Sequence, residues 1–217
     1  MPVTEYYVLW KVTVPSTWMA AVLGLIAGWL AVRRQFGKRS AELIGDAFFT
    51  VLIVWKLSVI VTDFPVVWRS PAAILYFNGG APGFIAGMCV AGLLAVRSEK
   101  RLPVSFSRVI LLAAACAQGV YQIMMALLNA GPAYAKVLTA VLFGTLVIAA
   151  FRYAGRHEMP VRSGALLLIA VHAFTAAVQP SGFAGIPFAA TVAAGALIIL
   201  TDVRLRQSGK QLEGLDE

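Results

Sequence analysis

The stretch VILLAAACAQGVYQIMMALL (residues 109–128) contains no charged side chain and is long enough to cross a membrane as one helix. An α-helix rises about 1.5 Å per residue, so about 20 residues cross a hydrocarbon core about 30 Å thick. Comparable apolar runs precede and follow it. Of the 217 residues, 60% are hydrophobic and 13% are charged, and the mean hydropathy is +0.82. The sequence therefore predicts an all-α, polytopic membrane protein built as a transmembrane helix bundle.

Charged residues, prolines and glycines divide the apolar runs into about seven transmembrane helices. Neither an internal repeat nor a second domain is visible, so we expect a single transmembrane domain over residues 1–217, with a short disordered cytoplasmic tail over about 204–217. The first run has no basic segment before it and no small-residue cleavage pattern after it, so we interpret it as a retained helix. The predicted spans are residues 14–32, 42–62, 71–96, 104–128, 134–151, 162–178 and 183–202.

The positions of the basic residues predict the orientation in the membrane. Lys and Arg together number 18 and Asp and Glu 10, which gives a net charge of +8. The basic residues are concentrated in RRQFGKR, RSEKR, RYAGRHEMPVR and the C-terminal segment, which alternate with uncharged connections such as NAGPA. Because cytoplasmic loops carry an excess of Lys and Arg, we expect the N-terminus outside and the C-terminus inside. The basic residues form no single patch, so we expect no nucleic-acid partner.

The two cysteines do not indicate a metal site. Cys89 and Cys116 lie in separate apolar runs, without a CxxC spacing or a histidine pair beside them. Such cysteines usually pack between helices as small apolar residues. We therefore expect neither a metal nor a cofactor.

The segment FNGGAPGF (residues 77–84) interrupts the third predicted span. Glycines make the backbone flexible, and proline lacks an N–H group. Unpaired backbone groups at membrane depth are tolerated only against protein or a water-lined cavity. We expect the third span to be broken by this Gly/Pro segment and to line a cavity; a simple kink with close helix packing is the alternative.

Several polar side chains lie at a similar depth in different predicted spans. Lys56 stands in VLIVWKLSVIV (residues 51–61), where a charged side chain costs on the order of 3 kcal/mol and normally faces the bundle or an interface. Helix rise places Asn78, Gln118, Gln122 and His172 roughly 9 to 16 Å below the outer surface. We infer an outward-facing polar cavity, although glutamine and histidine also serve to pack helices together. The predicted cavity or lipid-headgroup-binding residues are Lys56, Asn78, Gly79, Gly80, Gln118, Tyr121, Gln122 and His172.

The order of features from Asp46 to Arg101 resembles that of prolipoprotein diacylglyceryl transferase, and the fourth predicted span resembles the stretch that holds the signature of that family. This family consists of seven-span bacterial membrane enzymes, with the N-terminus outside, that move diacylglycerol from phosphatidylglycerol to a lipobox cysteine. The resemblance implies the same fold and a cavity in the outer half of the membrane. It rests on the segments GDAFF, WKLSVIV, SPAAILYFNGG, GLLAVRSEKRLP and AAACAQGVYQIMMALLN.

The departures from the family pattern fall on the residues that carry the chemistry. The segment GGAPGFIAG contains no histidine where the family has one, and Gln122 and Met125 stand where its signature has arginine and asparagine. Lys56 likewise replaces an arginine. The transfer needs a base to activate the thiol and cations to hold the phosphate leaving group, and glutamine supplies neither. The resemblance therefore implies a degenerate relative in which Lys56 is the remaining cation of a former active site.

We accordingly expect a membrane protein that binds a lipid or a partner without catalysis, in a bacterial cytoplasmic membrane. The expected partners are a membrane phospholipid, with phosphatidylglycerol as a candidate, and a lipoprotein or another membrane protein. One alternative is an active diacylglyceryl transferase with an altered residue set, for which Lys56 and His172 are the catalytic candidates. A second alternative is a small membrane transporter that uses the broken third span as its binding element.

Overall fold

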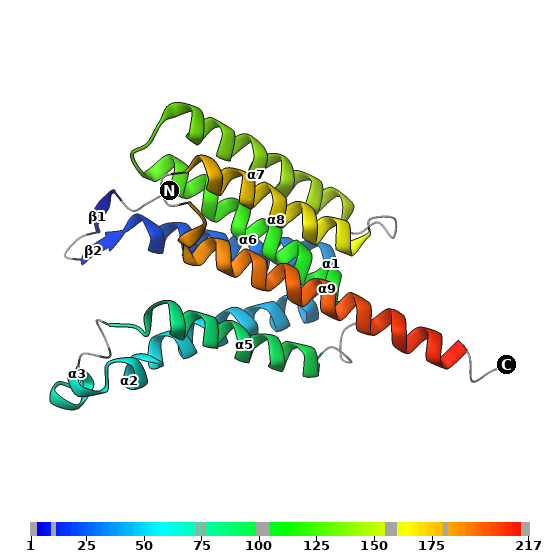
Figure 1. The fold of residues 1–217 in the computed structure, drawn as a ribbon, viewed down its shortest axis with the longest axis horizontal. Coiled ribbons are helices and arrows are strands. Elements are labelled where there is room, and N and C mark those ends of the chain that lie inside the picture. Colours follow the sequence, from blue (N-terminus) through cyan, green and yellow to red (C-terminus); the bar gives the residue numbers. More distant parts are fainter. Residues whose placement is uncertain are drawn as a thin grey trace. The chain divides into compact units, whose positions relative to one another are not determined.

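The computed structural model describes residues 4–9, 12–72, 74, 77–98, 105–154, 160–179 and 182–213, and the chain in these ranges is almost entirely helical (Figure 1). A short antiparallel hairpin precedes the helices, with Tyr6 opposite Pro15 and Leu9 opposite Val12. The elements are β1 (Tyr6–Leu9), β2 (Val12–Pro15), α1 (Ser16–Leu57), α2 (Val59–Thr62), α3 (Phe64–Arg69), α5 (Gly80–Ser98), α6 (Phe106–Leu128), α7 (Ala133–Tyr153), α8 (Val161–Val178), the 3₁₀ helix η2 (Gly182–Ala184) and α9 (Ile186–Glu213).

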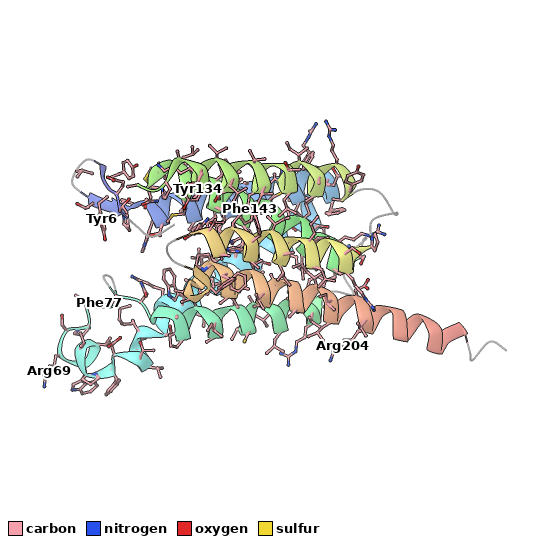
Figure 2. The ribbon with its side chains drawn as sticks, turned by 45° about the horizontal axis from the view of Figure 1, so that its top comes forward. Tyr6, Arg69, Phe77, Tyr134, Phe143 and Arg204 are labelled. Carbon is pink, nitrogen blue, oxygen red and sulfur yellow. The ribbon has the colours of Figure 1, made fainter. Side chains whose placement is uncertain are left out.

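Within the described residues, six helices are long and apolar enough to cross a membrane. Their outer faces carry large apolar side chains, among them Leu127 (65% exposed) and Tyr134 (64% exposed), and Figure 2 shows such side chains projecting from the ribbons. In water this surface would be unfavourable, whereas a hydrocarbon environment covers it at no cost. The prediction of an all-α, multi-pass membrane protein is confirmed at this level.

The first two predicted spans, residues 14–32 and 42–62, fall in two helical stretches of α1 that meet at a kink at Gly37. The helix α1 runs from Ser16 to Leu57, and the connecting segment RRQFGKR belongs to it. Gly37 interrupts the helical backbone with φ 81° and ψ −177°, a conformation that glycine adopts more readily than other residues. The segment is rich in Arg, Lys and Gln, which favour helix, and contains no proline. Helical backbone therefore continues on both sides of Gly37.

The third predicted span, residues 71–96, contains a non-helical stretch at the Gly/Pro segment. Phe77, Asn78 and Gly79 are not helical, and α5 starts at Gly80, which has φ 58°. Pro82 then falls in the first helical turn, where its missing N–H is not needed. Non-helical backbone at residues 77–79 therefore coincides with the Gly/Pro segment at which the sequence predicts a break. Residues 73, 75 and 76 of the predicted span lie outside the described residues.

The remaining helices follow the predictions more closely. The predicted spans 104–128, 134–151 and 162–178 correspond to α6, α7 and α8 with ends shifted by a few residues. The last helix continues to Glu213, into the segment that we expected to be a disordered tail.

The chain divides into two compact units. Unit 1 comprises residues 1–41 and 104–217, and unit 2 comprises residues 42–103. In unit 1, α6 contacts α7, α8 and α9, and Figure 1 shows it among them. Val109 and Leu112 of α6 are almost fully buried. We therefore describe α6 as the central helix of unit 1.

Glycines allow α1 to approach α6 closely. A Cβ atom added at Gly24 would lie 2.6 Å from the carbonyl oxygen of Ala117, and one added at Gly28 would lie 2.8 Å from that of Ala113. Small residues at such positions let helix backbones come together, which is how helices associate where lipid removes the hydrophobic drive. The start of α1 is therefore held against the middle of α6 by backbone contact.

Small residues also allow close helix packing in unit 2. The buried residues of α5 are Gly83, Gly87, Ala91 and Ala95, spaced four apart on one helical face. A Cβ atom added at Gly87 would lie 2.8 Å from the carbonyl oxygen of Val51. This small-residue face therefore lies directly against the second half of α1.

Candidate functional site

His172 lies at the centre of a buried polar cluster in unit 1. Its side chain, on α8, is only 3% exposed. The Nε2 atom of Gln122, on α6, is 2.9 Å from His172 Nε2, and Gln118 Nε2 is 3.4 Å from His172 Nδ1. Thr191 Oγ1, on α9, is 2.7 Å from Nδ1. We call these residues, Gln118, Gln122, His172 and Thr191, the His172 cluster; it ties α6, α8 and α9 together.

Two aromatic rings enclose the imidazole. Phe143 of α7 meets it edge-on, with ring centroids 5.6 Å apart and planes at 80°. Phe188 of α9 does the same at 5.3 Å and 89°. Together with the polar partners, the two rings leave His172 almost without contact with solvent, since 3% of the residue is exposed. The His172 cluster is therefore a closed polar contact between helices, and its polar groups face one another.

The partners of the cluster indicate one arrangement of its protons. Thr191 Oγ1 donates to the carbonyl oxygen of Pro187 at 3.1 Å, so His172 Nδ1–H donates to Thr191 and His172 Nε2 accepts from Gln122 Nε2. Gln118 Nε2, 3.4 Å from Nδ1, is then a neighbour of the imidazole and does not donate to it. Gln122 Oε1 then has no hydrogen-bond partner. Among the described residues, it is the one buried side-chain oxygen or nitrogen atom without a partner. An unpaired buried acceptor costs free energy, so the cluster stabilises the bundle less than a fully paired network would.

The structure brings together three residues that the sequence predicted to share a site: Gln118, Gln122 and His172. Their role in binding stays a prediction. Thr191 was missed, because a threonine in an apolar helix usually bonds its own backbone and gives no signal of a distant partner. Phe143 and Phe188 were missed for a similar reason, since aromatic residues are common throughout the apolar runs.

Tyr121 lies next to Gln122 in sequence but faces a different neighbour. It packs against a hydrophobic cluster formed by Ala20, Met125 and Ala135. Successive residues of a helix point about 100° apart, so Tyr121 turns towards α1 when Gln122 turns towards α8. In this structure Tyr121 is a packing residue at the contact of α1 with α6.

Thr175 of α8 and Gln179 at its C-terminal end are polar as well but do not join the His172 cluster. Gln179 Nε2 donates to Thr139 Oγ1 of α7 at 3.1 Å. Thr175 Oγ1 donates to backbone carbonyl oxygens of its own helix, 3.1 Å from Val171 O and 3.0 Å from His172 O. Gln179 therefore connects the end of α8 to α7, and Thr175 bonds within α8.

The predicted residues Asn78, Gly79 and Gly80 lie in unit 2 and are paired there. Asn78 Oδ1 accepts from Gly80 N–H at 3.0 Å. Trp55 of α1 holds the same turn, because its Nε1–H donates to Gly80 O at 2.9 Å and its carbonyl oxygen accepts from Gly79 N–H at 3.0 Å. These backbone groups at the start of α5 are therefore paired within the protein, and that the segment lines a cavity stays a prediction.

Lys56 follows Trp55 near the end of α1 and is half-buried. It belongs to unit 2 together with Asn78, Gly79 and Gly80, whereas the His172 cluster belongs to unit 1. A cavity shared by residues of the two units stays a prediction.

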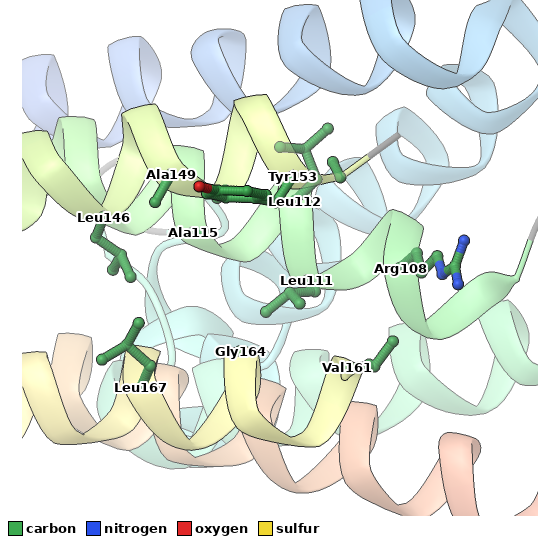
Figure 3. Close-up of a pocket in the computed structure, with 12 residues that line it drawn as sticks. Arg108, Leu111, Leu112, Ala115, Leu146, Ala149, Tyr153, Val161, Gly164 and Leu167 are labelled. Atoms are coloured by element: carbon green, nitrogen blue, oxygen red, sulfur yellow. The ribbon is translucent and has the colours of Figure 1, made fainter. Parts of the chain in front are cut away.

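Unit 1 also contains a groove that the sequence did not predict (Figure 3). It lies between α6, α7 and α8, at the end of the unit where α6 and α8 begin and α7 ends. Its walls are formed by aliphatic residues and alanines, with Arg108 and Tyr153 among them. No sequence signal marks it, because the space depends on which small side chains face one another across three helices.

No group of three or more His, Cys, Asp or Glu side chains within the described residues is arranged to hold a metal ion. No protein-family model matches the chain, and no curated protein matches it either.

Proposed function

We propose that this chain is a non-catalytic membrane protein on a scaffold like that of prolipoprotein diacylglyceryl transferase, which binds a phospholipid or a membrane partner in a bacterial cytoplasmic membrane. The observation that carries the proposal is the closure of the His172 cluster. Both ring nitrogens of His172 face side chains of the cluster, and 3% of the residue is exposed. A general base has to come within hydrogen-bond distance of the proton that it removes from a substrate. His172 is therefore better suited to join helices than to activate a thiol.

The charges of the predicted site support the same proposal. Transfer of a diacylglyceryl group expels a phosphate, which needs cationic groups around the leaving oxygen. Gln118 and Gln122 carry no charge, and Lys56 offers a single point charge without the bidentate geometry of arginine. These three side chains are therefore better suited to binding a lipid headgroup than to stabilising a phosphate leaving group.

The proposed topology has seven crossings, with the N-terminus outside and the C-terminus inside. From Ser16 to Thr62 the helical segment covers 47 residues. At 1.5 Å per residue this is about 70 Å, more than twice the thickness of a hydrocarbon core of about 30 Å. Two crossings divided at Gly37 fit this length, and the basic residues around Gly37 fit a cytoplasmic turn.

A transfer assay tests the absence of catalysis. The purified protein in phosphatidylglycerol vesicles is incubated with a lipobox peptide, and the peptide is analysed by mass spectrometry beside an active diacylglyceryl transferase as positive control. We expect no diacylglyceryl mass shift with this protein. A shift that disappears in Lys56→Ala or in His172→Ala would overturn the proposal and establish the active transferase in its place.

A further inference from the structure

Two exposed carboxylates of unit 2 mark the two ends of a membrane crossing. Asp46 and Asp63 are both exposed, and the charged residue between them, Lys56, is half-buried. The helical rise from Asp46 to Asp63 is about 26 Å. A hydrocarbon core is about 30 Å thick, and an exposed carboxylate is disfavoured inside it. Asp63 therefore lies where the hydrocarbon core meets the lipid headgroups.

The backbone turns at Asp63, and the short helix α3 follows directly. Asp63 has φ −132° and ψ 42°, so α2 ends there and Phe64–Arg69 form a separate helix. Pro65 falls in the first turn of α3, where its missing N–H is not needed. A helix this short is not stable alone, and the buried Val67 and the contacts of α3 with α2 hold it in unit 2. Figure 1 shows α3 at the end of unit 2 where α2 ends.

The outward side of α3 is aromatic. Phe64 and Trp68 lie four positions apart on the helix, and their rings stack with centroids 5.8 Å apart and planes at 28°. Phe64 is 53% exposed, Trp68 is 77% exposed, and Val61 of α2 is 83% exposed. Arg69 is exposed at the end of α3, and Figure 2 shows its side chain projecting from this end. Large apolar side chains and a cation therefore share one short surface.

The lipid headgroup region suits both the rings and the charges of this surface. In water, the exposed rings of Phe64 and Trp68 would be unfavourable. In the hydrocarbon core, the charges of Asp63 and Arg69 would be unfavourable. Among the headgroups, an indole ring covers its apolar face with the upper acyl chains while its N–H group donates to a lipid oxygen or to water. A guanidinium group at the same level reaches the lipid phosphates.

We propose that α3 binds the phospholipid headgroup region at the outer surface of the membrane and anchors unit 2 there. Trp68 lies among the lipid ester groups, and Arg69 contacts phosphates. The partner of this surface is the lipid surface itself, and no residue of the His172 cluster takes part. The inference rests on the membrane location and orientation of the proposed function, and deepens it by giving a surface of the protein that contacts headgroups.

Depth-dependent fluorescence quenching of the full chain in vesicles tests the position of Trp68. The vesicles contain phosphatidylcholine that is brominated either near the headgroup end of its acyl chains or near their methyl end. The emission of Trp68→Phe is subtracted from that of the unchanged protein, which isolates the emission of Trp68; phenylalanine keeps an aromatic ring beside Phe64. We expect the bromines near the headgroups to quench this emission several-fold more than those near the methyl end.

Ile53→Trp, made in the Trp68→Phe background, is the matched control. Ile53 is 40% exposed on α1 and lies about 15 Å before Asp63 along the helix, so the new indole should be quenched mainly by the bromines near the methyl end.

Three results would overturn the proposal. Stronger quenching of Trp68 by the deep bromines would mean that α3 lies in the hydrocarbon core. Quenching by aqueous acrylamide alone would mean that α3 lies in water. Protection from all of these quenchers would mean that another protein or a second copy of the chain covers the ring. Transfer activity in the peptide assay, or the opposite orientation in the membrane, would contradict the proposed function and leave the measured depth of Trp68 unchanged.

Discussion

Gln122 of α6 lies with its Nε2 atom 2.9 Å from Nε2 of His172 on α8, so this side-chain contact joins two helices of unit 1. Removing the imidazole should therefore leave a buried amide without this partner. We expect His172→Leu to lower the free energy of unfolding by about 1 kcal/mol, the size of a buried interhelical hydrogen bond. SDS titration of the purified full chain, followed by circular dichroism, measures this change.

The double variant His172→Leu, Gln122→Leu provides the control, because replacing both partners with apolar groups is close to neutral. We expect it to recover at least half of the loss. If the effects of the two substitutions simply add, the contact does not couple the helices in the way the structure indicates.

Substitution of Gly28 tests the close approach of α1 to α6. A Cβ atom at this position would lie 2.8 Å from the carbonyl oxygen of Ala113, so Gly28→Ala should force the helices apart at a cost of about 1–3 kcal/mol. Gly144 of α7 is the matched control, since a Cβ atom there would meet nothing within 4 Å. Gly144→Ala should be neutral or stabilise the helix by up to about 1 kcal/mol. Equal effects of the two substitutions on thermal denaturation would contradict the predicted packing.

Asn129 holds the N-terminal hairpin on the end of α6. Its Oδ1 atom accepts from Thr4 N–H at 2.9 Å and from the Ser16 hydroxyl at 2.7 Å. Asn129→Ala removes this acceptor from a buried position, which should cost about 1–3 kcal/mol and free β1 and β2 from α6. Hydrogen exchange should then accelerate over residues 4–9. Asn78→Ala, in unit 2, is the matched control, and acceleration of hairpin exchange in that variant would argue against a local role for Asn129.

Cysteine labelling tests the proposed topology. In a chain with Cys89 and Cys116 replaced by serine, Lys38→Cys adds an exposed thiol beside Gly37, and Tyr134→Cys adds one at the start of α7. A membrane-impermeant maleimide added to intact cells should label position 134 and should reach position 38 only after the membrane is opened. Labelling of both positions from one side would contradict a crossing pattern with N-terminus outside and seven spans.

The sequence by itself determined that this chain is helical and suited to a membrane. In hydrocarbon every backbone N–H and C=O group has to be paired within its own segment, so long apolar runs such as residues 109–128 become helices. The rise of the helix also determined depth, which is why Gln118, Gln122 and His172 could be predicted to lie at one level. The glycines and proline near residue 80 correctly indicated a change in the backbone, since residues 77–79 are not helical and α5 begins at Gly80.

Only the tertiary structure decided which side chains meet. The depth of a residue along a helix follows from counting residues. Which partner its side chain meets depends on where the neighbouring helices lie. Thr191 bonds His172 and Tyr121 packs towards α1 for this reason, and Asn78 is paired within its own turn by contacts that involve Trp55 of another helix. The groove at Arg108 arises in the same way, since alanines and a glycine on three helices make a space only where they face each other. These contacts depend on close packing between distant segments, which no local pattern of residues encodes.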